Sequence, residues 1–167
     1  FGSDWESDDV PSVQIIVDDA LVVMAGNSIY KLDRKTGKTL ARGEMVAKPN
    51  WGYTPPTYAA GLIFCPLSGG TIQAFDAKTL KSVWVYKDPL GGQSISPITY
   101  SDGYIYTGFW TGEETDAHYV CLSISDNRTK EQIENGETGE KLSSWMITQN
   151  KGFYWTGSVV IGDYVIV

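Results

Sequence analysis

The sequence predicts an all-β fold made of repeated units, and three observations lead to it. The 167 residues include 18 Gly and 7 Pro beside 6 Trp, 10 Tyr and 5 Phe, a composition rich in turn formers and in aromatic strand formers. Similar segments recur about every 42 residues. Each unit holds four short apolar runs with a turn about every ten residues, which is typical of a β-propeller blade rather than of a sandwich.

A predicted hairpin opens each unit. Residues 55–64 match residues 97–106 at an offset of 42, and further copies lie at 14–23 and 157–166. Each copy has two apolar or β-branched runs around a short turn. One position is taken as equivalent in the four copies: Leu21, Leu62, Tyr104 and Tyr164. The spacings are then 41, 42 and 60, so the third unit carries an insertion of about 18 residues.

Two further strands complete each predicted unit. Residues 28–38 match residues 71–81 at an offset of 43, and each segment is a strand followed by a turn rich in Asp, Thr and Gly. The fourth run is predicted at residues 39–45, 82–86 and 142–147.

These segments resemble a known family. Residues 74–84 are similar to the Ala-x-Asp-x-x-Thr-Gly-Lys-x-x-Trp signature of the PQQ-like β-propeller repeat, and residues 96–106 resemble the stretch that opens each such blade. The resemblance covers roughly residues 12–167. It implies that the Asp-to-Trp segment docks neighbouring blades. The residues given this docking role by position are Asp33, Thr36, Gly37, Asp76, Thr79 and Trp84.

Three positions depart from the family pattern. Leu80 stands where the pattern has Gly, Ala41 replaces the docking Trp of the first copy, and Ser123 replaces the Asp of the third. The departures favour the non-catalytic, BamB-like members of the quinoprotein alcohol dehydrogenase-like superfamily over its enzymes.

The repeat also predicts how the chain is divided. Residues 1–11 are interpreted as an N-terminal extension, followed by blades at roughly 12–48, 49–90, 91–150 and 151–167, the last incomplete. Propellers close with roughly 4 to 8 blades, and the resemblance implies about seven or eight. The chain is therefore predicted to be a fragment of a larger propeller, completed by missing blades or by a second copy.

The insertion of the third unit is divided between two segments. About five extra residues lie around residues 112–118, and about twelve lie within residues 125–137. We expect both to be solvated loops on one rim of the propeller. The alternative is that they carry specificity for a partner, because binding residues concentrate on loops held by a rigid scaffold.

Charge and composition exclude some classes of partner. The formal net charge is −7, which disfavours nucleic acid. No apolar run approaches the ~18 residues needed to span a bilayer. Cys65 and Cys121 lie in different units and lack metal-ligand spacing, so both are expected to be core residues.

Catalytic motifs are weak. Glu113, Glu114 and Asp116 form an acidic cluster without the pattern of a calcium loop, and His118 is the only histidine, with no nucleophile motif around it. No catalytic, cofactor or metal residue is predicted. A PQQ-dependent dehydrogenase would require PQQ, a calcium site and, commonly, a disulfide between adjacent cysteines, so the enzyme stays an alternative.

Aromatic residues precede the hairpins and are the candidate ligand-binding residues. Equivalent positions hold Trp51, Gln93 and Phe153, and then Tyr53, Ile95 and Trp155. Innermost strands line the channel of a propeller, where exposed aromatic rings bind sugars or extended peptides. Packing between blades is the competing explanation. The candidates for ligand binding are Trp51, Tyr53, Gln93 and Trp155.

The leading hypothesis is a non-catalytic propeller, secreted or at the cell surface, that acts as a protein-binding or assembly scaffold. The extracytoplasmic location is implied by the resemblance alone. The alternatives are a fragment of a PQQ-dependent dehydrogenase and a carbohydrate-binding surface module, so the partner is a protein or a glycan.

Overall fold

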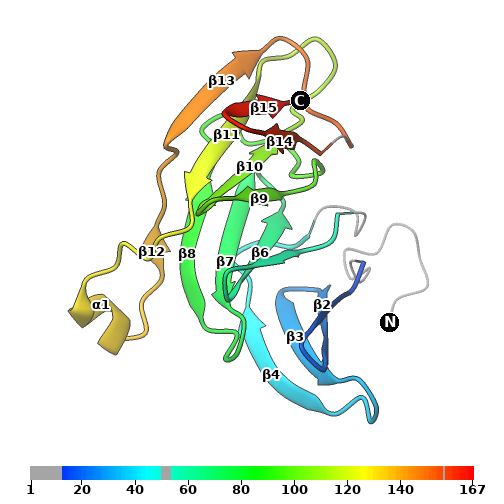
Figure 1. Ribbon diagram of the computed structural model, residues 1–167, viewed down its shortest axis with the longest axis vertical. Coiled ribbons are helices and arrows are strands. Elements are labelled where there is room, and N and C mark those ends of the chain that lie inside the picture. Colours follow the sequence, from blue (N-terminus) through cyan, green and yellow to red (C-terminus); the bar gives the residue numbers. More distant parts are fainter. Residues whose placement is uncertain (1–12, 50–53, 156) are drawn as a thin grey trace.

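The computed structural model describes residues 13–49, 54–155 and 157–167. Its strands form successive sheets that follow the chain (Figure 1). Blade 1 contains, in spatial order, β1 (Ile15–Val17), β2 (Ala20–Ala25), β3 (Ser28–Asp33) and β4 (Thr39–Glu44). All neighbouring strands in it are antiparallel.

Blade 2 repeats this order and gains one strand. It contains β5 (Thr57–Ala59), β6 (Leu62–Leu67), β7 (Thr71–Asp76) and β8 (Ser82–Lys87). The added strand β12 (Gly139–Glu140) pairs in parallel with β8 and comes from the insertion of the third unit.

Blade 3 and a terminal hairpin follow. Blade 3 contains β9 (Thr99–Ser101), β10 (Tyr104–Gly108), β11 (Ala117–Ser123) and β13 (Trp145–Gln149). The terminal hairpin pairs β14 (Val159–Ile161) with β15 (Tyr164–Ile166). We call the edge formed by the first strand of each sheet the inner edge, and the edge formed by β4, β8 and β13 the outer edge. The all-β fold of three blades and the start of a fourth is therefore confirmed.

The hairpin register corrects the sequence alignment of the first unit. In every hairpin a two-residue turn separates the last residue of the first strand from its partner, because turn length fixes register. The partners that follow the turn are Ala20, Leu62, Tyr104 and Tyr164. Ala20, not Leu21, is thus equivalent to Leu62, and the first spacing is 42 rather than 41. Two adjacent apolar residues made the one-residue error invisible in the sequence.

Blade 2 lies between two hydrophobic clusters because its side chains alternate between its two faces. Its Ile63, Cys65 and Phe75 join Val22, Met24 and Ile29 of blade 1. Its opposite face joins blade 3 in the second cluster, through Phe64, Ile72, Ala74, Trp84, Ile105, Val120 and Leu122. Both faces of blade 2 are therefore covered.

Polar side chains connect blades 1 and 2 at the same interface. The buried Gln73 of β7 accepts a hydrogen bond from the Val46 amide (2.9 Å) and donates to the carbonyl of Glu44 (3.3 Å). The Lys31 ammonium of β3 donates to the carbonyl of Ala77 (2.9 Å). The bonds of Gln73 satisfy a buried amide that would otherwise oppose the docking of the two sheets.

The insertion is not a pair of simple rim loops. His118 lies within β11 rather than in the predicted loop. Residues 125–144 carry the short helix α1 (Lys130–Glu134) and β12, and they run along the outer edge of blade 2 (Figure 1). The fourth strand of the third unit, β13, therefore begins at Trp145 rather than near residue 142, because residues 141–144 cross from β12 to β13.

Arg128 holds this insertion in place. Its guanidinium makes a bidentate pair with Asp126 (2.9 and 2.7 Å) and donates to the carbonyls of Ser82 (3.1 Å) and Glu137 (2.8 Å). A planar fork with several fixed donors suits this role better than a lysine.

The described residues contain no helix of the length and apolarity that a membrane span requires.

Candidate functional site

The predicted docking turns of the first two units have nearly the same geometry. Asp33 accepts bonds from the Thr36 hydroxyl (2.8 Å) and the Thr36 amide (2.7 Å), and Asp76 accepts from the Thr79 hydroxyl (2.7 Å) and amide (2.8 Å). The fifth residue of each turn has positive φ, which is +71° at Gly37. Thr36, Gly37 and Thr79 are exposed and the two aspartates are partly buried, so the Asp–Thr bonds shape the turns, and the docking role of these residues stays a prediction.

The hydrogen bonds of these turns change the acidity of both carboxyl groups. The Thr36 hydroxyl is the main cause that holds the pKa of Asp33 below its ordinary value. At Asp76 partial burial raises the pKa, but the Thr79 hydroxyl and the two turn amides outweigh it and leave the pKa lowered.

Trp84 is buried at the interface between blades 2 and 3. It is 0% exposed, its ring contacts Phe64 at 5.8 Å between centroids, and its indole donates to the carbonyl of Ile124 at 3.4 Å. The ammonium of Lys141 lies 5.1 Å from its ring centroid. The insertion therefore covers Trp84 from the outer edge.

A position equivalent to Trp84 in blade 3 escaped the sequence analysis. Trp84 pairs with Ala74, and Trp145 pairs with Cys121 at the same place in its own blade. The insertion hid this match, because it separates Trp145 from Ser123 by far more residues than the family spacing. Trp145 is 41% exposed. Blade 3 thus carries the family tryptophan, but its face toward the terminal hairpin is only partly covered.

The inner edge holds a pocket of about 420 Å³ at the point where the segments leading into three successive inner strands meet. Its lining residues are Thr54, Pro55, Ile95, Pro97 and Trp155. The repeat spacing makes Pro97 equivalent to Pro55, and Trp155 equivalent to Ile95. The pocket therefore arises from the repeat itself, and its walls are apolar apart from Thr54.

Hydroxyl groups fix the inner strands around this pocket. Thr54 donates to the carbonyl of Ile95 and Thr57 to that of Ile98, both at 3.0 Å across blades 2 and 3. Thr99, the counterpart of Thr57, donates to the next inner strand at the carbonyl of Ser158 (2.8 Å). The threonines join adjacent inner edges and hold the pocket walls at fixed positions.

An exposed aromatic stack lies beside the pocket. Tyr154 and Trp155 stack with centroids 4.4 Å apart, and Trp110 meets Tyr154 edge-on at 5.5 Å. Trp155 is 60% exposed, so it does not serve mainly to fill space between blades. Trp110 and Tyr154 were not singled out in the sequence, because the equivalent positions of earlier units hold Ser68 and Ser94 and so show no aromatic pattern.

The other candidate residues have different surroundings. The half-buried Gln93 pairs through its backbone with Trp110 (2.7 and 3.0 Å) and so holds the base of the stack. Phe153 packs on Tyr119 (5.0 Å), between blade 3 and the terminal hairpin. Trp51 and Tyr53 lie outside the described residues. Of the four candidates, the structure places Trp155 at the pocket and Gln93 behind the stack.

A buried carboxylate joins blades 2 and 3 near the outer edge. Asp88 accepts from the Tyr86 hydroxyl (2.9 Å) and the Leu90 amide (3.0 Å), and Nδ1 of His118 lies 2.9 and 3.0 Å from its two oxygens. Since both oxygens already accept hydrogen bonds, we assign the shared proton to Nδ1. Burial is the main cause that raises the pKa of Tyr86. The arrangement joins two blades, and among the described residues no Ser, Thr or Cys side chain is one of its hydrogen-bond partners.

Side chains that could hold a metal ion do not cluster in the part of the chain that the structure describes. Within residues 13–49, 54–155 and 157–167, no three His, Cys, Asp or Glu side chains form a group that could hold a metal ion. Cys65 and Cys121 are buried, free and in different blades, and burial raises the pKa of both thiols.

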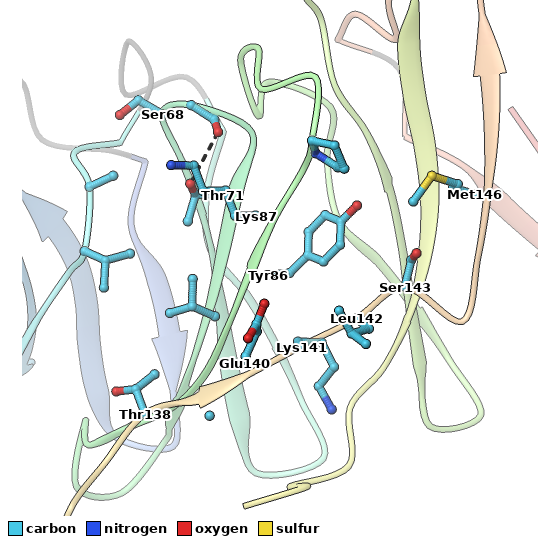
Figure 2. A pocket seen from close by; sticks show the side chains of 16 residues that line it. Ser68, Thr71, Tyr86, Lys87, Thr138, Glu140, Lys141, Leu142, Ser143 and Met146 are labelled. Carbon is cyan, nitrogen blue, oxygen red and sulfur yellow. Dashed lines mark hydrogen bonds between the residues drawn. The ribbon is translucent and has the colours of Figure 1, made fainter.

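A second concave surface, the outer groove, runs along the outer edge of blade 2, from Val46 and Ala47 after β4 of blade 1 to Met146 of blade 3. It encloses about 830 Å³. Ser68 and Thr71 line one side of it, and Ser143 and Met146 line the opposite side (Figure 2). Tyr86 of β8 lies between these two sides, and the segment that leaves β12, with Lys141 and Leu142, lies below them in the view. The outer groove depends on the insertion, so it could not be inferred from the repeat.

The repeated four-stranded sheets, their Asp–Thr turns and the interblade tryptophan define a β-propeller of PQQ-like blades. A family model described as outer membrane protein assembly factor BamB matches residues 5–141. The chain belongs to this family. A comparison with curated proteins finds no match.

Solved structures show the same fold at low sequence identity. BamB from Moraxella catarrhalis is 15% identical with a TM-score of 0.64, over 94% of this chain and 46% of that one. The computationally designed Ika4 protein is 14% identical with a TM-score of 0.61, over 99% of this chain and 91% of that one. A quinohemoprotein alcohol dehydrogenase from Comamonas testosteroni is 17% identical with a TM-score of 0.58, over 86% of this chain and 22% of that one. The chain thus spans less than half of the natural proteins it resembles.

Proposed function

We propose that this chain is part of a non-catalytic, extracytoplasmic β-propeller that binds another protein as an assembly scaffold. The observation that carries the proposal is the inner-edge pocket with its exposed aromatic stack. Trp155, Tyr154 and Trp110 offer rigid apolar contact area beside a pocket whose walls are held by interblade hydrogen bonds. Rigid aromatic anchors of this kind are enriched at sites that dominate protein interfaces.

Membership of the family supports both the partner class and the location. The family description names an assembly factor of the outer membrane, and BamB from Moraxella catarrhalis shares the fold. The acidic net charge of −7 disfavours nucleic acid as the partner. An assembly scaffold requires a fixed surface and no catalytic groups.

Site-specific photocrosslinking in cells that produce the protein tests the proposal. A photoreactive phenylalanine derivative at Tyr154 is expected to give a discrete protein adduct, which disappears when Trp155→Ala is added. The same probe at Leu40, which is 54% exposed on blade 1, serves as the control. Absence of a protein adduct at position 154, or an adduct that is indifferent to Trp155→Ala, would contradict the proposal.

Two other outcomes distinguish the alternatives. Binding to a glycan array that depends on Trp155 would replace the scaffold with a carbohydrate-binding module. A spectral change and dye reduction after addition of PQQ and calcium would identify a dehydrogenase fragment, the class of the quinohemoprotein neighbour. We expect neither result.

A further inference from the structure

The three outer-edge strands differ in how their free edge is protected. β4 carries a charged pair, Arg42 and Glu44, whose side chains meet at 2.8 Å. β8 is covered by β12. Charged side chains and covering segments are two devices by which proteins prevent a sheet edge from pairing with another chain. β13 has neither device: its residues are uncharged, and all five are exposed.

The outer edge of β8 shows what this kind of edge can accept. β12 pairs there in parallel with Trp84 and Val85, and the Lys141 amide donates to the carbonyl of Val85 at 2.8 Å. The registers of blades 2 and 3 make Met146 the equivalent of Val85. The molecule therefore already adds a strand at the blade 2 position that Met146 occupies in blade 3.

The backbone of β13 directs hydrogen-bonding groups toward its open side. In an antiparallel ladder, alternate residues bond to opposite neighbours. His118 bonds toward β10, since its carbonyl accepts from the Phe109 amide (3.0 Å). Its partner Thr148, and likewise Met146, therefore turn their N–H and C=O groups outward. No other described strand pairs with this side of β13.

Apolar surface flanks the open edge on the side of the outer groove. Met146 lines the outer groove together with Leu142, which is 75% exposed. A strand placed beside β13 would therefore meet apolar surface with the alternate side chains that face the groove.

We propose that the outer edge of β13 binds an extended, uncharged segment of a partner protein as an added strand, in the position that β12 occupies on β8. The segment has apolar residues at alternate positions, which lie over the outer groove beside Met146 and Leu142. This inference rests on the proposed scaffold function and gives it a second surface, distinct from the inner-edge pocket. Main-chain bonds supply affinity, and the apolar contacts supply selectivity.

A displayed library of random peptides of about eight residues, long enough for one strand, tests the proposal on the intact chain. We expect enrichment of uncharged peptides with alternating apolar residues. Their affinity should fall about tenfold or more on Met146→Pro, which removes an outward N–H but leaves the bonds of β13 to β11 in place. Thr148→Lys, which adds a charge without proline, should also weaken binding, and peptide should slow amide exchange at Thr148.

Matched controls separate this surface from the inner-edge site. Arg42→Pro places the same change at the equivalent position of β4, and it should leave peptide affinity unchanged. Trp155→Ala should also leave it unchanged. Failure to enrich any peptide, or equal binding to wild type, Met146→Pro and Thr148→Lys, would overturn the proposal. If peptide binding is lost only in the Trp155→Ala variant, the edge site is overturned and the scaffold function is supported. Thermal melts confirm that each variant folds.

Discussion

The two complete blade interfaces solve the same packing problem with different residues. Between blades 2 and 3, Trp84 and Tyr86 of β8 fill the interface. At the equivalent positions of β4, blade 1 has Ala41 and Gly43. The space is filled there from the other side of the interface by Leu80, which is 1% exposed and packs in the cluster shared by blades 1 and 2.

The hydrogen bond of the missing tryptophan is replaced as well. The Trp84 indole donates to the carbonyl of Ile124, the residue that follows β11. The carbonyl of Ala77, which follows β7 in the same way, accepts from the Lys31 ammonium instead (2.9 Å). Two departures from the family pattern, Ala41 for Trp and Leu80 for Gly, thus belong to one packing arrangement. The comparison teaches that a docking residue is a property of the interface rather than of a single repeat.

The largest expected effect comes from removing the interblade tryptophan. Trp84→Ala should lower the free energy of unfolding by about 3–5 kcal/mol, because it opens a cavity in a fully buried site. Trp145→Ala, at the equivalent position of blade 3, should cost about 1 kcal/mol, because that ring is 41% exposed. Urea titrations measure both values. Equal losses would show that exposure does not distinguish the two interfaces.

Restoring the family residues should reveal their coupling. Ala41→Trp alone should cost about 1–3 kcal/mol through overpacking against Leu80. Together with Leu80→Gly, which removes the Leu80 side chain, Ala41→Trp should lower the free energy of unfolding by less. The coupling energy in a double-mutant cycle should be about 0.5–3 kcal/mol. Strict additivity in unfolding experiments would refute the idea of a single compensating arrangement.

At Leu80, replacement by Gly should destabilise the chain less than replacement by Ala, the reverse of the usual order. Its φ is +55°, a conformation that costs a residue with a Cβ about 1–2 kcal/mol and costs Gly almost nothing. Both Leu80→Ala and Leu80→Gly lose buried apolar area, but only Gly relieves the backbone strain. Leu80→Gly should therefore be more stable than Leu80→Ala by about 1 kcal/mol. A less stable Gly variant would mean that the strain is not present.

The smallest effect concerns pH. The pKa of Asp76 is lowered in the folded chain, so its contribution is fully present above the unfolded pKa of about 3.9 and is lost as pH falls through the folded value. Asp76→Asn should make stability less dependent on pH below about 4, with little change near pH 7 in the slope of stability against pH. Thr79→Val should do the same to a smaller extent. If the stability of wild type and of Asp76→Asn falls in the same way as the pH is lowered below about 4, this turn is not a source of acid sensitivity.

The repeat allowed much of the fold to be predicted, and the insertion limited the rest. Hairpins, turns and fourth strands were predicted in units 1 and 2 because their periodicity and turn residues are local features of the chain. In unit 3 the start of β13 was misplaced, since β12 and α1 separate it from β11. Trp155 was predicted at the inner edge, but Trp110 and Tyr154 complete the site through contacts between segments more than 40 residues apart.

By itself, the sequence determined the blade: alternating apolar runs, two-residue turns and Asp–Thr turns specify four antiparallel strands through local chemistry. Only the tertiary structure decided how the blades meet. It placed Leu80 over Gly43, gave β8 a parallel strand from the insertion and left β13 open. The physical reason is that packing and edge pairing depend on which surfaces face each other, and two chains with the same local pattern can fill those surfaces from either side.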